Sequence, residues 1–235
     1  MILKGIFILA TYLTLILSVK YIESEEYYQG EYYFLLLCSL LGAVIIASSR
    51  DLLILFIGIE LASGPMFLLS GWKKSSPESN EGAIKFFLFG VLSAALILYG
   101  FSLLYGLTGE ILFENIAFLL ESNNSSAASM AIVLVLAGLG FKISAVPFHS
   151  WAPDTYQGAP VPVAAYLSVS SKSAGFVALL LFTTKVVPAF GQVWGPILLI
   201  MSGLTMTVGN LIALQQENAI RLLAYSSIAQ AGFIL

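Results

Sequence analysis

Eight long apolar runs, each close to the length that crosses a lipid bilayer, dominate this sequence. Short polar linkers separate the runs, and the alternating pattern typical of transmembrane β-strands is absent from the sequence. We predict helices over about 2–19, 32–48, 52–71, 83–105, 128–148, 161–187, 194–213 and 221–235. The expected fold is an all-α polytopic membrane protein, with a single transmembrane domain over residues 1–235.

The composition excludes several other classes of protein. Apolar residues make up 59% of the chain and charged residues 10%, against roughly 45–50% and 25% in ordinary globular proteins. The net charge is −3 without a basic block, so we expect no nucleic-acid partner. The single cysteine, Cys38, excludes an internal disulfide and a CxxC site, and the single histidine, His149, excludes an HExxH zinc site. We therefore predict neither a metal site nor a cofactor site in this chain, and the lipid bilayer as its surroundings.

Two local features lead to further expectations. The last apolar run stops at Leu235 after about 15 residues and without a cap, so we expect the sequence to be part of a longer protein. The linker from Glu110 to Glu121 is amphipathic, and we predict an interfacial helix there with its apolar residues facing lipid. Those apolar residues are Ile111, Phe113, Ile116 and Leu120.

Three ionisable residues lie deep inside apolar runs, namely Glu60, Lys142 and Lys172. Each central charge costs about 2.5–3.5 kcal/mol on insertion scales, so the three together cost roughly 8–10 kcal/mol before any pairing. We predict that these charges are paired, hydrated or both. Lys85 lies near the start of its run, where a lysine can extend to the membrane surface.

Prolines follow two of these charges at the same spacing. Pro65 lies five residues after Glu60, and Pro147 lies five residues after Lys142. Proline has no N–H and displaces the carbonyl four residues before it, which frees a backbone acceptor beside each charge. Such backbone is tolerated at membrane depth only inside protein or beside water. We therefore predict a broken helix near Lys142–Pro147 that lies beside a buried ion path.

These residues leave a proton relay and a structural ion pair both open. Burial favours the neutral amine of a lysine and a nearby carboxylate favours the ammonium, so moving the carboxylate would make the lysine bind or release a proton. Glu60 and Lys142 could equally form a fixed pair that locks two helices together. Lys172 has no obvious second acid, and we expect Asp154 to cap or pair within its own loop.

The segment from Gly140 to Pro160, together with Lys172, resembles the antiporter-like subunits of respiratory complex I. The Phe-Lys, Pro-Phe-His and Pro-Asp pattern of this segment carries the resemblance. It is most similar to subunit N, called subunit 2 in mitochondria and NdhB in chloroplasts. Four further stretches agree: 49–65, 80–87, 98–106 and 221–230.

The resemblance implies a fold, a function and roles for four residues. The fold would contain two inverted helical repeats, the first over roughly 32–187 and the second beginning at 194–235 with its remainder missing. Glu60 would pair with Lys142 on the broken helix, Lys172 would pass charge laterally, and Lys85 matches a further family lysine. The chain would translocate protons, driven by redox chemistry in other subunits.

The same resemblance implies the chain's surroundings. NADH, FMN, iron–sulfur clusters and quinone would belong to partner subunits, among them neighbouring antiporter-like subunits. We expect a multi-pass protein of the bacterial plasma membrane, or of an organelle or thylakoid membrane. Two other functions stay open: a subunit of a multisubunit Na⁺/H⁺ antiporter, and a scaffold whose buried charges are only structural.

Overall fold

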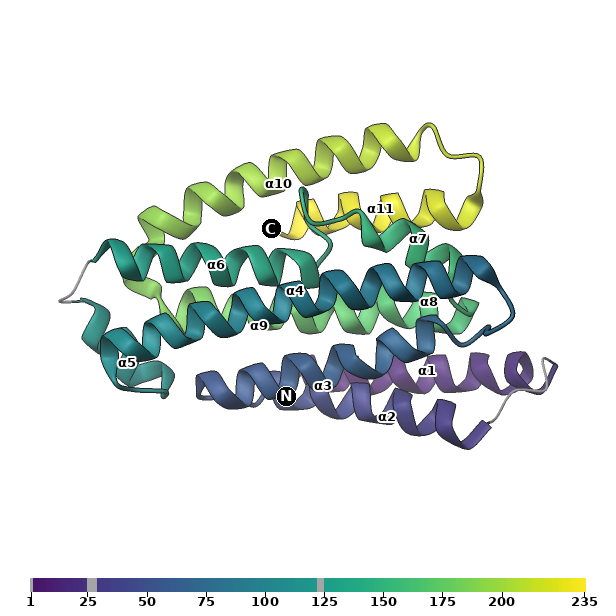
Figure 1. Ribbon diagram of the computed structural model, residues 1–235, viewed down its shortest axis with the longest axis horizontal. Coiled ribbons are helices and arrows are strands. Elements are labelled where there is room, and N and C mark those ends of the chain that lie inside the picture. The colour runs from purple at the N-terminus through teal and green to yellow at the C-terminus, as the bar shows by residue number, and fades with distance from the viewer. Residues whose placement is uncertain (1, 25–28, 122–124) are drawn as a thin grey trace.

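The computed structural model describes residues 2–24, 29–121 and 125–235 as a bundle of long helices that run parallel and antiparallel to one another (Figure 1). The first half comprises α1 (Ile2–Ser24), α2 (Gln29–Ile46), α3 (Leu52–Ser70), α4 (Pro77–Thr108), α5 (Phe113–Glu121), α6 (Ser126–Lys142) and α7 (Trp151–Gly158). The second half comprises α8 (Val161–Tyr166), the π-helix η1 (Leu167–Ser171), α9 (Lys172–Leu181), the π-helix η2 (Phe182–Val186), the short η3 (Pro188–Phe190), α10 (Gly191–Ala213) and α11 (Ala219–Ile234).

Helices occupy all eight predicted spans, which confirms the expected all-helical membrane fold. Within the described residues, five helices are long and apolar enough to cross a bilayer: 2–22, 52–70, 77–108, 161–186 and 188–213. Three shorter apolar helices cover 30–46, 126–142 and 219–234. Two predicted boundaries differ by six residues: the helix expected to reach residue 148 ends at Lys142, and the helix expected to begin at residue 83 begins at Pro77.

Side-chain caps explain where several helices begin. The Asp51 carboxylate accepts a hydrogen bond from the Ile54 amide at 2.8 Å, and the Ser125 hydroxyl accepts one from the Ala128 amide at 3.2 Å. A capping oxygen satisfies one of the amides that a helix start leaves without a partner. Polar residues between apolar runs therefore fix the ends of the membrane helices.

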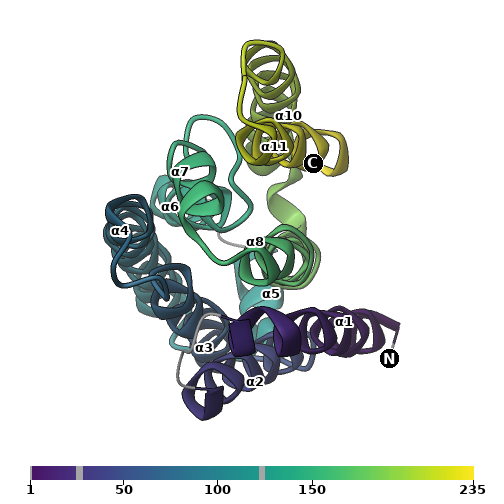
Figure 2. The same ribbon diagram turned by 90° about the vertical axis from the view of Figure 1, so that its right-hand side faces the viewer.

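Viewed along the bundle, the helices form three groups around a central column (Figure 2). The column is the continuous stretch α8–η1–α9–η2. The helices α1–α3 lie on one side of it, α4, α6 and α7 on a second side, and α10 with α11 on a third. The functional side chains come from these separate groups, so helix packing decides which of them meet.

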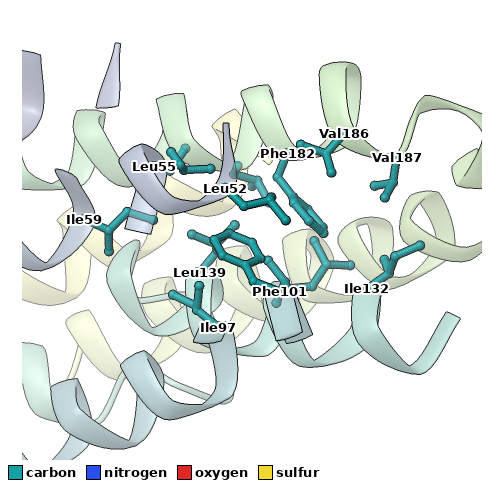
Figure 3. Packing of buried hydrophobic residues seen from close by; sticks show 14 of the residues in the cluster. Leu52, Leu55, Ile59, Ile97, Phe101, Ile132, Leu139, Phe182, Val186 and Val187 are labelled. Carbon is teal, nitrogen blue, oxygen red and sulfur yellow. The ribbon is translucent and has the colours of Figure 1, made fainter. Parts of the chain in front are cut away.

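A buried apolar cluster holds the α5 end of the bundle together (Figure 3). Leu55 of α3, Ile97 of α4, Ile132 of α6 and Phe182 of η2 are fully buried in it and come from different groups of helices. In the same region α4 and α6 lie close together. The Ser93 hydroxyl of α4 donates a hydrogen bond to the Gly138 carbonyl of α6 at 2.8 Å. In lipid, such close contacts and hydrogen bonds associate helices where no hydrophobic effect can.

The helix α5 forms as predicted, but three of the four residues expected to face lipid are buried in the protein, while Phe118 is 74% exposed. Phe113, Ile116 and Leu120 are all at most 4% exposed and belong to the buried cluster. Two backbone hydrogen bonds cause this, because they tie the segment before α5 to the start of α3. The Leu52 amide donates to the Ile111 carbonyl, and the Phe113 amide donates to the Arg50 carbonyl, both at 3.0 Å.

We predict that Gly138→Val lowers stability, because a Cβ at this position would lie 2.8 Å from the Ser93 carbonyl oxygen. Overpacking a close contact of this kind costs about 1–3 kcal/mol. The control is Gly106→Val on α4, where a Cβ would meet nothing within 4 Å. Thermal unfolding of the detergent-solubilised subunit would measure both, and equal midpoints for the two variants would contradict the predicted close contact.

Candidate functional site

Lys142 lies at the centre of the candidate site, as the last residue of α6, and it is 9% exposed. Its Nζ donates to Glu60 Oε1 at 3.1 Å and to Ser63 Oγ at 2.9 Å, both on α3. The Ser63 hydroxyl in turn donates to the Ile59 carbonyl at 2.7 Å, so it offers its lone pairs to the ammonium. The Phe67 ring lies 5.8 Å from the same Nζ. The charge is thus neutralised by one carboxylate and held by one hydroxyl and one ring face.

The chain leaves the helical path directly after Lys142, close to the predicted break. Ser144 has a positive φ of 58°, a backbone conformation that residues other than glycine rarely adopt. The Ala145 amide bonds back to the Gly140 carbonyl at 2.8 Å, while the Val146 amide donates to Thr205 Oγ1 of α10 at 2.9 Å. Backbone polar groups at the break are therefore satisfied by protein groups. The last carbonyls of α6 also favour a cation at this end of the helix.

Lys172 is the second buried lysine, at 5% exposure, and it begins α9 directly after the π-helical turn η1. Its Nζ donates to Ser227 Oγ of α11 at 2.7 Å and lies 5.9 Å from the Tyr156 ring. In the described ranges no carboxylate lies within ion-pair distance of it. The two buried lysines therefore differ in their partners: a carboxylate supports Lys142, whereas a neutral hydroxyl supports Lys172.

A small cavity of about 20 Å³ lies beside Lys142 on the side of α9. Ser63, Lys142 and Ser171 are the polar residues of its lining, and Gly175 of α9 also lines it. A Cβ on Gly175 would lie 2.9 Å from Ile143 Cγ2. The volume suits one water molecule, which needs two to four polar partners to be stable in a buried site.

A second charged group lies where α4, α7 and α11 meet, and it contains the last of the predicted site residues. Lys85 Nζ contacts both Asp154 Oδ2 and Glu81 Oε1 at 2.6 Å, and Arg221 Nη1 contacts Asp154 Oδ1 at 2.7 Å. Arg221 also donates to Gln157 Oε1 at 2.9 Å. We call Lys85, Asp154 and Arg221 the charged cluster. Lys85 shares no partner with Lys142 or Lys172.

The expectation for Asp154 was wrong in one respect. Its carboxylate pairs with two other helices and not within its own loop. The physical reason is the tight contact of α7 with α4, where the Thr155 hydroxyl donates to the Gly82 carbonyl at 3.1 Å. This contact carries Asp154 to Lys85, and the first turn of α11 supplies Arg221.

Sequence reasoning identified the buried charges but not their neutral partners. Ser63 and Ser227 each bond a buried lysine, yet serines are common in membrane helices. Ser227 and Thr205 lie among other polar residues of their helices, but the sequence does not indicate which group either one bonds. The burial of the aromatic residues around Trp151 could not be predicted either, because buried and lipid-facing aromatic residues form the same pattern in a sequence.

Comparisons with known proteins agree on one family. The profile described as NADH:quinone oxidoreductase/Mrp antiporter, TM, matches residues 49–235. NADH-quinone oxidoreductase subunit N from Desulfitobacterium hafniense is 41% identical over 234 residues, which cover 99% of this chain and 47% of the relative. The chain thus spans about half the length of the curated relatives it matches. The predicted resemblance is confirmed.

Solved structures share the fold. Respiratory complex I from Thermus thermophilus contains a chain that matches with a TM-score of 0.82 and 37% identity, over 99% of this chain and 49% of that chain. The Mrp complex from Dietzia sp. contains one with a TM-score of 0.76 and 29% identity, over 88% of this chain and 22% of that chain.

We predict that Asp154 and Arg221 stabilise the fold cooperatively, although the pair is partly exposed. In a double-mutant cycle with Asp154→Asn and Arg221→Gln, the coupling should be about 0.5–1 kcal/mol. The measurement is the free energy of unfolding in detergent. A parallel cycle with Glu114→Gln at the opposite end of the bundle should give no coupling. Equal couplings in the two cycles would argue against the ion pair.

Proposed function

Because this chain belongs to the NADH:quinone oxidoreductase/Mrp antiporter transmembrane family, we propose that it is a proton-translocating membrane subunit of an NADH:quinone oxidoreductase. Redox chemistry would take place in partner subunits that hold NADH, FMN, iron–sulfur clusters and quinone. This chain would move protons and would assemble with other membrane subunits in a bacterial plasma membrane. We further propose that residues 32–187 form the first of two inverted repeats and that 194–235 begin the second.

The ion pair between Lys142 and Glu60 at the broken helix supports this proposal most strongly. A buried ammonium that depends on one carboxylate changes its proton affinity when that carboxylate moves or is neutralised. The break allows such movement, because the regular helical hydrogen bonds end at Ile143 and the next amides are held by single bonds, such as that of Val146 to Thr205. Broken helices beside buried ions also recur at the binding sites of transporters.

Lateral transfer from Lys142 to Lys172 would use the small cavity between α6 and α9. A single water there would lie among the Lys142 ammonium and the hydroxyls of Ser63 and Ser171. Among the described residues, Lys172 Nζ donates to the neutral Ser227 hydroxyl, whereas Lys142 Nζ also has the Glu60 carboxylate. In the proposed relay, Lys172 would receive a proton from Lys142 by way of this water and pass it on. Lys85 would hold a proton at the membrane surface.

We expect Lys142→Ala in the full-length subunit to reduce NADH-driven acidification of inverted membrane vesicles to below about a tenth of the wild-type rate. The reason is that the variant removes the group that carries the proton, while a native gel reports assembly of the complex. Lys74→Ala, at an exposed turn, is the matched control and should leave the rate unchanged.

Unchanged acidification in an assembled Lys142→Ala complex would make Lys142 a structural partner of Glu60 and would disprove the relay.

The second candidate function is a subunit of a multisubunit Na⁺/H⁺ antiporter, favoured by the similarity to the Mrp complex. Wild-type vesicles that exchange Na⁺ for protons, but show no NADH-driven signal, would establish it. Co-purifying flavin and iron–sulfur subunits would instead support the oxidoreductase.

Ser171 and Ser173 provide a test of the proposed water site in the small cavity. Ser171 lines the small cavity beside Lys142, whereas Ser173 lines an outer groove with Phe7 and Leu198. We expect Ser171→Ala to slow NADH-driven acidification about two- to tenfold, because it removes a hydrogen-bond partner of the water. Ser173→Ala should have no effect. If both variants pump at the wild-type rate, the proposed water site is wrong.

A further inference from the structure

Four aromatic side chains lie between Lys142 and the charged cluster. They are Phe67 of α3, Phe86 of α4, Phe141 of α6 and Trp151 of α7, and none is more than 9% exposed. The Phe86 and Trp151 rings stack with centroids 4.2 Å apart and planes at 8°, and Phe141 lies 5.1 Å from Trp151. The Phe67 ring meets Phe86 edge-on at 4.6 Å.

One ring contacts a charged group, and the other three belong to residues close in sequence to charged ones. Phe67 lies 5.8 Å from the Lys142 ammonium, and Phe141 precedes Lys142 in α6. On the other side, Phe86 directly follows Lys85, while Trp151 lies one turn before Asp154 on α7. Ring contacts therefore run from Lys142 through Phe67 and Phe86 to Trp151, on the helices that carry Lys85 and Asp154.

The aromatic group offers water no binding site. Its one polar side-chain atom, Trp151 Nε1, donates to the Phe141 carbonyl at 3.2 Å, so it is already satisfied. Beside it, α4 and α7 are in close contact, since a Cβ on Gly82 would lie 2.7 Å from the Asp154 carbonyl oxygen. A buried water needs at least two polar partners, and apolar constrictions exclude water and ions by staying dry.

We propose that Phe67, Phe86, Phe141 and Trp151 form a dry seal that blocks proton exchange between Lys142 and the charged cluster. The side chains of Lys85, Asp154 and Arg221 are 25–39% exposed, whereas that of Lys142 is 8% exposed and that of its partner Glu60 is 31% exposed. Exchange of protons on this side requires the Phe86–Trp151 stack to separate. The inference rests on the proposed function, in which Lys142 carries the proton.

The experiment uses the complete complex, with the full-length subunit, reconstituted in liposomes that contain a pH-sensitive dye. Passive proton uptake is driven by an imposed K⁺ diffusion potential without NADH, and NADH-driven acidification is measured separately. We expect Phe86→Ala to raise the passive proton conductance about threefold or more, because water enters where the ring stack was. Leu88→Ala, on the exposed side of the same helix, is the matched control and should not leak.

The double variant Phe86→Ala with Lys142→Ala identifies the route of the leak. Its conductance should return to the wild-type level, because the seal separates the surface from Lys142 itself. A leak that persists without Lys142, or no leak in an assembled Phe86→Ala complex, would overturn the proposal. If Phe86→Ala does not assemble, Phe86→Val gives the same comparison with less volume removed. A wild-type complex without NADH-driven acidification would reject the proposed function, while the passive arm would still test the seal.

Discussion

The ammonium of Lys142 has to be stabilised inside an apolar bundle, and much of the architecture follows from that requirement. An unpaired charge at the centre of a membrane helix costs about 2.5–3.5 kcal/mol or more. The structure supplies Glu60 and Ser63 on a single neighbouring helix, together with the C-terminal carbonyls of α6. α3 must therefore lie next to the end of α6, and the two helices cannot slide without breaking both contacts. The interaction fixes the position of one group of helices relative to another.

The break that follows Lys142 is held by partners from outside α6. Thr205 of α10 accepts the Val146 amide, and the Phe141 carbonyl accepts the indole N–H of Trp151. Both partners come from parts of the chain that pack on the break from different directions. A movement of α10 or α7 would thus change the geometry around Lys142 without any direct contact with the ammonium. This is the physical route by which neighbouring helices could control the proton affinity of the site.

The sequence predicts the charges well and their surroundings less well. Glu60 and Lys142 could be expected to pair, because membrane helices rarely tolerate isolated charges, and Pro147 indicated the break. The burial of Ile116 could not be predicted, because a protein core and lipid are equally apolar and select the same residues. Ser227 lies 55 positions from Lys172, and the packing of α11 on α7 and α10 places it beside the lysine. Asp154 was assigned to its own loop because the α4–α7 contact leaves no pattern in either segment.

The order of the partners along the chain has a consequence for biosynthesis. Glu60 leaves the ribosome 82 residues before Lys142, so the carboxylate enters the membrane before the lysine that pairs with it. Lys172 emerges next, and its hydroxyl partner on α11 follows 55 residues later. During that interval the insertion machinery must hold a lysine-bearing helix beside water or protein until α10 and α11 have been delivered. The ion pair between α3 and α6 can therefore form co-translationally, whereas Lys172 acquires its hydroxyl partner only when α10 and α11 arrive.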